Sequence, residues 1–125
     1  MKKILTYLPH ILFSAALLFV GAFGKLTGAA PAVAMFEQID MFGLGEQFGR
    51  ITVGLGQLFA GIGIFCKSTR KISAVIGIAI MVGAVFYHLT LFGGSPALPI
   101  AVMVLGIYIL LKGDCKKCEN GKCKC

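Results

Sequence analysis

The sequence predicts an all-α membrane protein: a bundle of four transmembrane helices with a short outer interfacial helix and a cytoplasmic cysteine-rich tail. Hydrophobic residues make up 58% of its 125 residues, and the mean hydropathy is +0.90. A soluble domain of this size cannot bury that much apolar surface. A helix of about 20 apolar residues crosses the hydrocarbon of a bilayer. The apolar residues form four runs near that length, at residues 4–24, 50–66, 72–92 and 97–111.

The positive charge of the chain predicts its orientation. The net charge is +7, and its bases gather at Lys2 and Lys3, in the 67–71 turn, and from Lys112 to Lys124. Cytoplasmic segments of membrane proteins carry an excess of Lys and Arg. We therefore expect both termini and the 67–71 turn in the cytoplasm, a multi-pass domain over residues 1–112 and a tail over 113–125. Because the charge is explained by topology, we expect the lipid bilayer as a partner and no nucleic acid.

The first apolar run follows Met1-Lys2-Lys3, which is also how a secretory signal peptide begins. However, the run is long for the apolar part of a signal peptide, and small residues suited to cleavage come only after Lys25. A retained first span is therefore the preferred interpretation. Beyond it, apolar residues at helical spacing alternate with polar ones over residues 32–42, which predicts an amphipathic helix lying in the outer interface.

Small residues mark the faces on which the second and third spans pack. In the second span, Gly54, Gln57 and Gly61 share one face, and Gly56, Ala60 and Gly63 share an adjacent one. Small residues at such spacing let helix backbones approach closely in lipid. In the third span, Gly77, Met81, Ala84 and His88 lie on one stripe. His88 is therefore expected on a packing face.

Three polar side chains are predicted in the outer half of the membrane. Lys25 ends the first span on the outer side. At 1.5 Å per residue, Gln57 lies about 10 Å below the outer start of the second span, and His88 about 6 Å below the outer end of the third. Ionisable residues at such depth are costly and are treated as functional by default.

Two interpretations of these residues remain open. In the first, Lys25, Gln57 and His88 form one site for an anionic or quinone-like head group from the outer leaflet, and His88 is the member able to exchange protons near neutral pH. In the second, they have separate structural roles, with Lys25 reaching the interface. Tyr7, His10 and Tyr108 fall toward the inner interface and are interpreted as anchors.

The tail holds four cysteines within its last eleven residues: Cys115, Cys118, Cys123 and Cys125. In the cytoplasm stable disulfides are disfavoured, and thiolates act more often as ligands or redox groups. Four thiolates suit a soft ion such as Zn(II) or Cu(I). The spacing is not that of a zinc ribbon, so a disordered tail with reduced thiols is the alternative. Cys66 faces the same compartment and is either a fifth ligand or a packing residue.

These features resemble the DoxX-like family of small four-span bacterial membrane proteins. The resemblance covers about residues 4–111. It rests on Gly24-Lys25-Leu26-Thr27-Gly28, the outer amphipathic segment, the glycine-rich second span, and Gly83-Ala84 followed by His88. It implies a four-helix bundle in the bacterial cytoplasmic (inner) membrane. The family includes subunits linked to thiosulfate:quinone oxidoreduction and to thiol-stress complexes, which implies a redox association. Members often carry Glu within the second span, where this chain has Gln57.

Three functions follow from these observations as hypotheses. The first is an accessory subunit of a membrane redox system, linked to thiols, sulfur or quinone, with a quinone at the outer site and other membrane redox subunits as partners. The second is a soft-metal-handling protein that binds Zn or Cu(I) through its tail. The third is a scaffold for larger membrane subunits. No nucleotide-binding loop, nucleophile elbow, or haem or flavin signature is present in the sequence, and we do not expect a self-sufficient enzyme.

Overall fold

The computed structural model describes residues 1–40 and 43–112, and every regular element within them is helical. The elements, in chain order, are α1 (Lys2–Ala15), the π-helix η1 (Ala16–Ala22), α2 (Phe23–Thr27), α3 (Ala30–Ile39), α4 (Glu46–Gly63), α5 (Arg70–Tyr87), the π-helix η3 (His88–Phe92) and α6 (Ala97–Lys112). The predicted all-α fold class is confirmed.

The first helix continues past the end of its apolar run. Segments α1, η1 and α2 follow one another without a break, and the helix ends at Gly28, where φ is +73°. A left-handed residue is a common helix stop, and glycine adopts it at little cost. Lys25 therefore lies inside the last helical turn, whereas the sequence predicts that the span ends at residue 24.

Helix α3 lies close to the position predicted for the short amphipathic helix. Pro31 is in its first turn, where the missing N–H costs nothing. Asp40 ends the helix with a φ of +36°. The amphipathic pattern predicts a helix over residues 32–42. The observed helix begins two residues earlier and ends at Ile39, and Met41 and Phe42 lie outside the described residues.

Two side chains close the turn between α4 and α5: those of Thr69, at the end of the turn, and Arg70, the first residue of α5. The hydroxyl of Thr69 donates a hydrogen bond of 2.8 Å to the carbonyl of Gly63, and Nε of Arg70 donates one of 3.1 Å to the carbonyl of Ile64. The last carbonyls of a helix lack partners within it. These two bonds satisfy part of that need and hold α4 antiparallel to α5.

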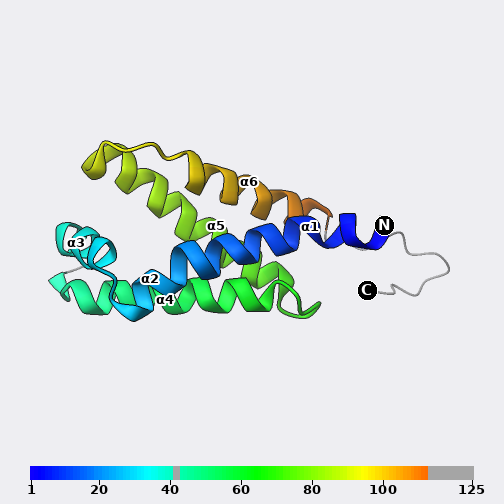
Figure 1. Cartoon of the computed structure of the whole chain (residues 1–125), viewed down its shortest axis with the longest axis horizontal. Helices are drawn as coiled ribbons and strands as arrows, with labels where there is room; N and C mark the ends of the chain where they lie inside the picture. The colour runs from blue at the N-terminus through cyan, green and yellow to red at the C-terminus, as the bar shows by residue number, and fades with distance from the viewer. Residues whose placement is uncertain (41–42, 113–125) are drawn as a thin grey trace.

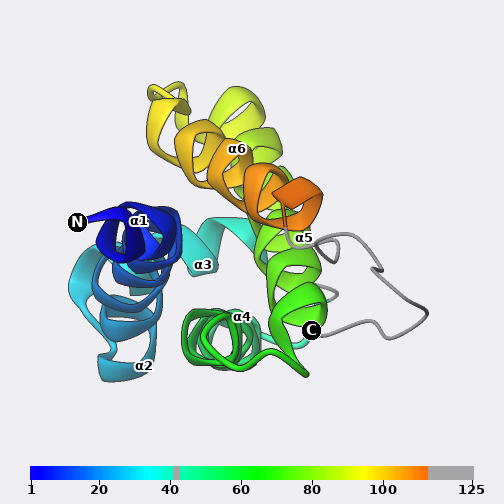
Figure 2. The ribbon, with the colours of Figure 1, turned by 90° about the vertical axis from the view of Figure 1, so that its right-hand side faces the viewer.

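The helices form a ring that opens toward one end. The first helix packs on α4, α4 on α5, α5 on α6, and α6 returns to α1 (Figure 2). Toward the opposite end, the α5–α6 pair diverges from the first helix and α4, and α3 lies across that end (Figure 1). We call it the α3 end. The N-terminus, the 64–69 turn and the end of α6 lie at the other end, which we call the basic end.

The two small-residue faces of α4 contact two different helices. A methyl group built on Gly61 would lie 2.8 Å from Leu18, and one built on Gly54 would lie 3.0 Å from Leu26, both on the first helix. One built on Gly56 would lie 3.1 Å from Ile80 of α5. A methyl group at these positions would push the neighbouring side chain away, so the glycines allow these helices to approach closely.

The surface of the bundle is more apolar than a soluble protein would present. Large hydrophobic side chains on every long helix are exposed, including Phe19 at 77%, Phe86 at 60% and Leu111 at 75%. Polar side chains are buried instead, namely Ser14, Arg50, Gln57 and Ser73. Extended exposed apolar surface marks contact with a membrane or a partner.

Within residues 1–40 and 43–112, two helices are long and apolar enough to cross a membrane, Ile4–Thr27 and Arg70–Leu91. In each, only 22% of the most apolar 18-residue window is buried within the bundle. A core helix of a soluble protein would be buried over most of its surface. A third helix, Ala97–Lys112, is apolar but shorter.

Candidate functional site

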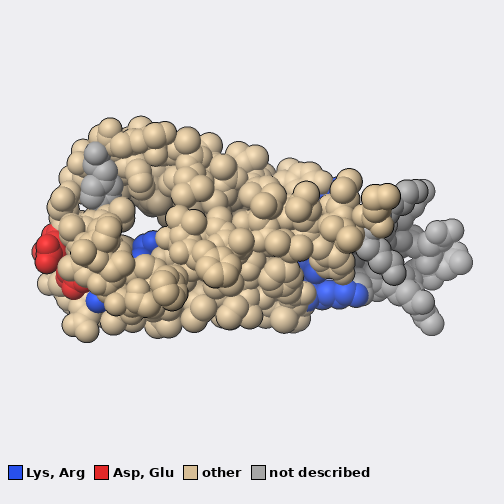
Figure 3. Space-filling model, viewed as in Figure 1, with Lys and Arg blue, Asp and Glu red and all other residues tan. Residues whose placement is uncertain are grey.

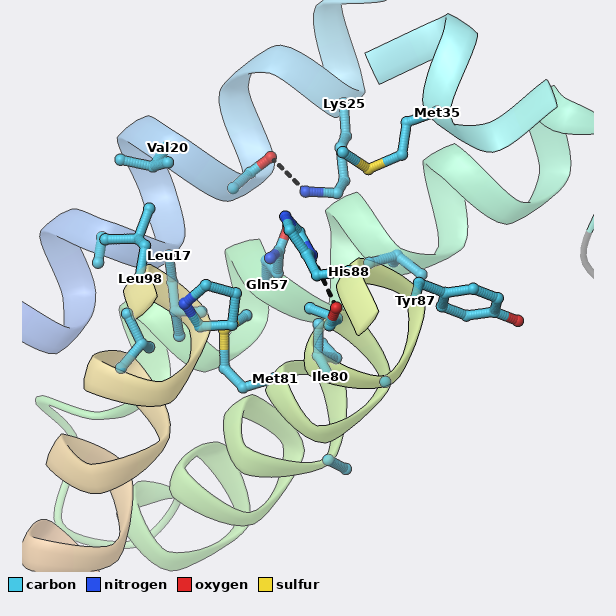
Figure 4. Close-up of a pocket in the computed structure, with 18 of the residues that line it drawn as sticks. Leu17, Val20, Lys25, Met35, Gln57, Ile80, Met81, Tyr87, His88 and Leu98 are labelled. Atoms are coloured by element: carbon cyan, nitrogen blue, oxygen red, sulfur yellow. Dashed lines mark hydrogen bonds between the residues drawn. The ribbon is translucent and has the colours of Figure 1, made fainter. Parts of the chain in front are cut away.

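Lys25 lies in α2, in the last turn of the first helix. Its ammonium nitrogen donates a hydrogen bond of 3.2 Å to the carbonyl oxygen of Gly21, four residues earlier. The bond turns the lysine back along the helix and toward the bundle interior, as Figure 4 shows. An ammonium group has three N–H donors, and this bond uses one of them.

Gln57 approaches the first helix at the same residue. A methyl group built on Gly21 would lie 2.6 Å from Nε2 of Gln57 and 2.7 Å from Oε1. The amide therefore packs directly on the glycine backbone. Gln57 is only 3% exposed, and its Oε1 has no hydrogen-bond partner in the part of the chain that the structure describes. Leaving a buried acceptor unpaired costs about 1–3 kcal/mol.

His88 occupies the junction of α5 and η3. Its Nδ1 lies 2.7 Å from the carbonyl oxygen of Ala84. A carbonyl can only accept, so Nδ1 carries the hydrogen in this bond, and in the neutral ring Nε2 is then an acceptor. The bond to Ala84 fixes the ring orientation against the helix.

The three polar side chains that the sequence singles out line one cavity of about 620 Å³. It lies where the helix pairs diverge, and Figure 4 shows Lys25, Gln57 and His88 converging on it. Most of the remaining wall is apolar, from residues such as Leu17, Val20, Met35, Ile80, Met81 and Leu98. Ligand cavities in proteins typically measure about 300–1,000 Å³ and combine an apolar lining with a few polar groups.

A smaller hollow lies next to the cavity, at the α3 end. This hollow, of about 370 Å³, is bordered by Pro31 of α3 and Gly94 of the α5–α6 turn. Met35, His88 and Ser95 line both spaces. His88 therefore borders both the main cavity and the smaller hollow.

Both π-helical segments contribute to the cavity wall. Gly21 belongs to η1, and His88 is the first residue of η3. Single π-helical turns are rare in proteins and frequently occur at functional sites. Nothing in the residue pattern of either segment distinguishes it from an ordinary α-helix.

Arg50 supports the site from outside the cavity, a role that reasoning from the sequence missed. Its side chain is 11% exposed; Nε donates to the carboxylate of Glu46 at 2.7 Å, and Nη1 donates to the backbone carbonyl of Lys25. Arg50 thereby joins the start of α4 to the end of the first helix. The one signal in the sequence is the spacing of Glu46 and Arg50, which suits an ion pair on one helix face.

The aromatic residues of the basic end do not join this cavity. Tyr7 and Tyr108 are 49% and 42% exposed, and the ring centroids of Tyr7 and His10 are 6.1 Å apart. The ammonium of Lys112 lies 4.9 Å from the centroid of the Tyr108 ring and donates to its hydroxyl. Aromatic and basic residues combine in this way at membrane interfaces.

The predicted metal ligands Cys115, Cys118, Cys123 and Cys125 lie outside the described residues. Cys66 is an exposed free thiol at the basic end. Within residues 1–40 and 43–112, no three His, Cys, Asp or Glu side chains come together to hold a metal ion. Metal binding by the tail stays a prediction.

Comparison of the chain with protein-family models, curated proteins and solved structures finds no match. The resemblance to the DoxX-like family stays a prediction that rests on the sequence features quoted for it.

Proposed function

We propose that this chain is a DoxX-like, four-span protein of the bacterial inner membrane, and that its cavity binds the head group of a quinone-like molecule. In this proposal it serves as an accessory subunit of a membrane redox system. The observation that carries ligand binding is the convergence of Lys25, Gln57 and His88 on one otherwise apolar cavity. The redox association comes from the family resemblance.

The dimensions of the bundle support four crossings. Helix α4 has 18 residues and α6 has 16, which at 1.5 Å per residue gives about 27 Å and about 24 Å. The hydrocarbon core of a bilayer is about 30 Å thick, and local thinning accommodates a shorter helix. Both helices pack side by side with the two longer apolar ones and also present apolar residues outward.

The distribution of charge supports cytoplasmic termini. Among the described residues, acidic side chains gather at the α3 end (Figure 3), on Glu37, Asp40 and Glu46. Lys67 and Arg70 lie at the basic end together with the N-terminus. With the basic end inside the cell, the cavity opens toward the outer side of the membrane.

Cysteine labelling tests this orientation. In one variant, Glu37→Cys is the only cysteine, because Cys66 and the four tail cysteines are replaced by serine. In the matched variant, Cys66 is the only cysteine. A membrane-impermeant maleimide should label Glu37→Cys in intact spheroplasts and should label Cys66 only after permeabilisation. Labelling of Cys66 in intact spheroplasts, or protection of Glu37→Cys there, would refute the topology.

Ligand binding is tested with the purified full chain in lipid nanodiscs, using calorimetric titration with 2-decyl-1,4-benzoquinone. We expect binding by the wild type and a loss of about tenfold or more in His88→Phe, because the larger apolar ring removes a polar group and occupies cavity space. Tyr108→Phe changes an aromatic residue at the basic end and should bind like the wild type. Absence of binding by the wild type, or equal binding by His88→Phe, contradicts the proposal.

A further inference from the structure

The most unusual polar group in the cavity is the amide oxygen of Gln57. Gln57 lines the cavity, and its amide oxygen is buried and has no hydrogen-bond partner among the described residues. Buried polar groups in proteins are almost always paired. An amide oxygen can only accept, so a molecule that completes this site must bring a hydrogen-bond donor.

A second polar group of the cavity, the ammonium of Lys25, requires a hydrogen-bond acceptor. The ammonium of Lys25 is a donor only, and its hydrogen bond to the Gly21 carbonyl uses one of its three N–H groups. Gly21 is also the residue on which the Gln57 amide packs. Lys25 and Gln57 therefore both contact Gly21, where Lys25 offers donors and the oxygen of Gln57 offers an acceptor.

The apolar side of the cavity reaches the outer surface of the bundle. Val20 of η1 and Leu98 of α6 line the cavity, yet they are 61% and 51% exposed. In Figure 4 these two side chains lie on the side away from Lys25 and His88. A hydrocarbon chain can pass between them from the head-group site to the lipid-facing surface, so the shape suits a molecule dissolved in the bilayer.

We propose that the cavity selects a lipid-soluble phenol or hydroquinone over the corresponding quinone or ether. A hydroxyl of the ligand donates to Oε1 of Gln57, a ligand oxygen accepts from Nζ of Lys25, and the alkyl chain lies between Val20 and Leu98. This inference rests on the proposed function, because it names the ligand class of the same cavity. A quinone has acceptor oxygens but no donor, so it leaves Oε1 of Gln57 without a hydrogen-bond partner.

Ligands with one chain and different head groups test the inference. The full chain in nanodiscs is titrated without oxygen with 2-decylhydroquinone, 2-decyl-1,4-benzoquinone and 2-decyl-1,4-dimethoxybenzene. We expect the hydroquinone to bind about tenfold more tightly than the dimethyl ether, and the quinone more weakly than the hydroquinone. Unsubstituted hydroquinone should bind more weakly than the decyl compound, because it lacks the chain.

Variants of Gln57 test whether its side-chain oxygen causes the preference for the hydroquinone over the ether. Gln57→Leu should bring the affinities for hydroquinone and ether close together, whereas Gln57→Glu keeps acceptor oxygens and should retain the preference. Tyr108→Phe should behave like the wild type. Equal affinities of the wild type for the three decyl compounds would overturn the inference and leave the proposed function standing. Binding of none of them would overturn both.

Discussion

Replacing Phe13 by alanine is expected to lower the free energy of unfolding by about 3–5 kcal/mol, the range for removing a large buried ring. Phe13 is completely buried. A methyl group built on Gly77 of α5 would lie 2.5 Å from its ring, and one built on Gly106 of α6 would lie 3.0 Å away. The ring therefore fills the junction of three helices, and the two glycines facing it have no side chains that could move into the space.

Phe19→Ala is the matched control for this prediction. Phe19 lies on the same long helix but is 77% exposed, and its removal should change stability by less than about 1 kcal/mol. Unfolding in mixed detergent micelles, followed by the helical circular dichroism signal, measures both variants. Similar losses of unfolding free energy in Phe13→Ala and Phe19→Ala would show that Phe13 does not pack between α5 and α6.

Gly21→Ala is expected to weaken binding of 2-decylhydroquinone by about tenfold or more while leaving the helical content unchanged. The added methyl group would lie within 2.7 Å of three atoms of the Gln57 amide. Atoms cannot remain so close, and the flexible end of Gln57 is the part that can move. The acceptor at the centre of the site is thereby displaced, although the bundle keeps its packing elsewhere.

Gly24→Ala provides the control on the same helix. A methyl group there would meet only Ala29, at 3.8 Å, which is ordinary van der Waals contact. Both substitutions replace glycine by alanine within a helix and so carry a similar gain in helix propensity. Calorimetric titration in nanodiscs should give a clearly weaker affinity for 2-decylhydroquinone in Gly21→Ala than in Gly24→Ala. Equal affinity of Gly21→Ala and Gly24→Ala would contradict the placement of Gln57 against Gly21.

Much of the fold could be predicted because its signals are local. Runs of apolar residues give the positions of the helices, since the length needed to cross a bilayer is set by the 1.5 Å rise. The 3.6-residue period places Gly54 and Gly61 on one face, and the structure packs both against the first helix. Helix ends were less predictable. The first helix continues to Thr27 because Gly28, rather than Gly24, adopts the left-handed conformation.

The candidate site was predictable only in part. A depth count along each span puts Lys25, Gln57 and His88 in the same half of the membrane, and the structure brings all three to one cavity. That they bind a ligand together stays a prediction. A depth count contains no information on rotation about each helix or on the distance between helices.

The sequence by itself determined that the fold is helical, that its exterior is apolar, and that basic residues gather at one end and acidic residues at the other. It could do so because hydropathy, periodicity and charge are properties of short segments. Only the tertiary structure decided that Gly21 holds the Gln57 amide, that Arg50 binds the end of the first helix, and that the helix pairs diverge to leave a cavity. These features depend on contacts between residues far apart in the chain. The closest approach of two helices is set by the side chains that meet there, and no single segment specifies it.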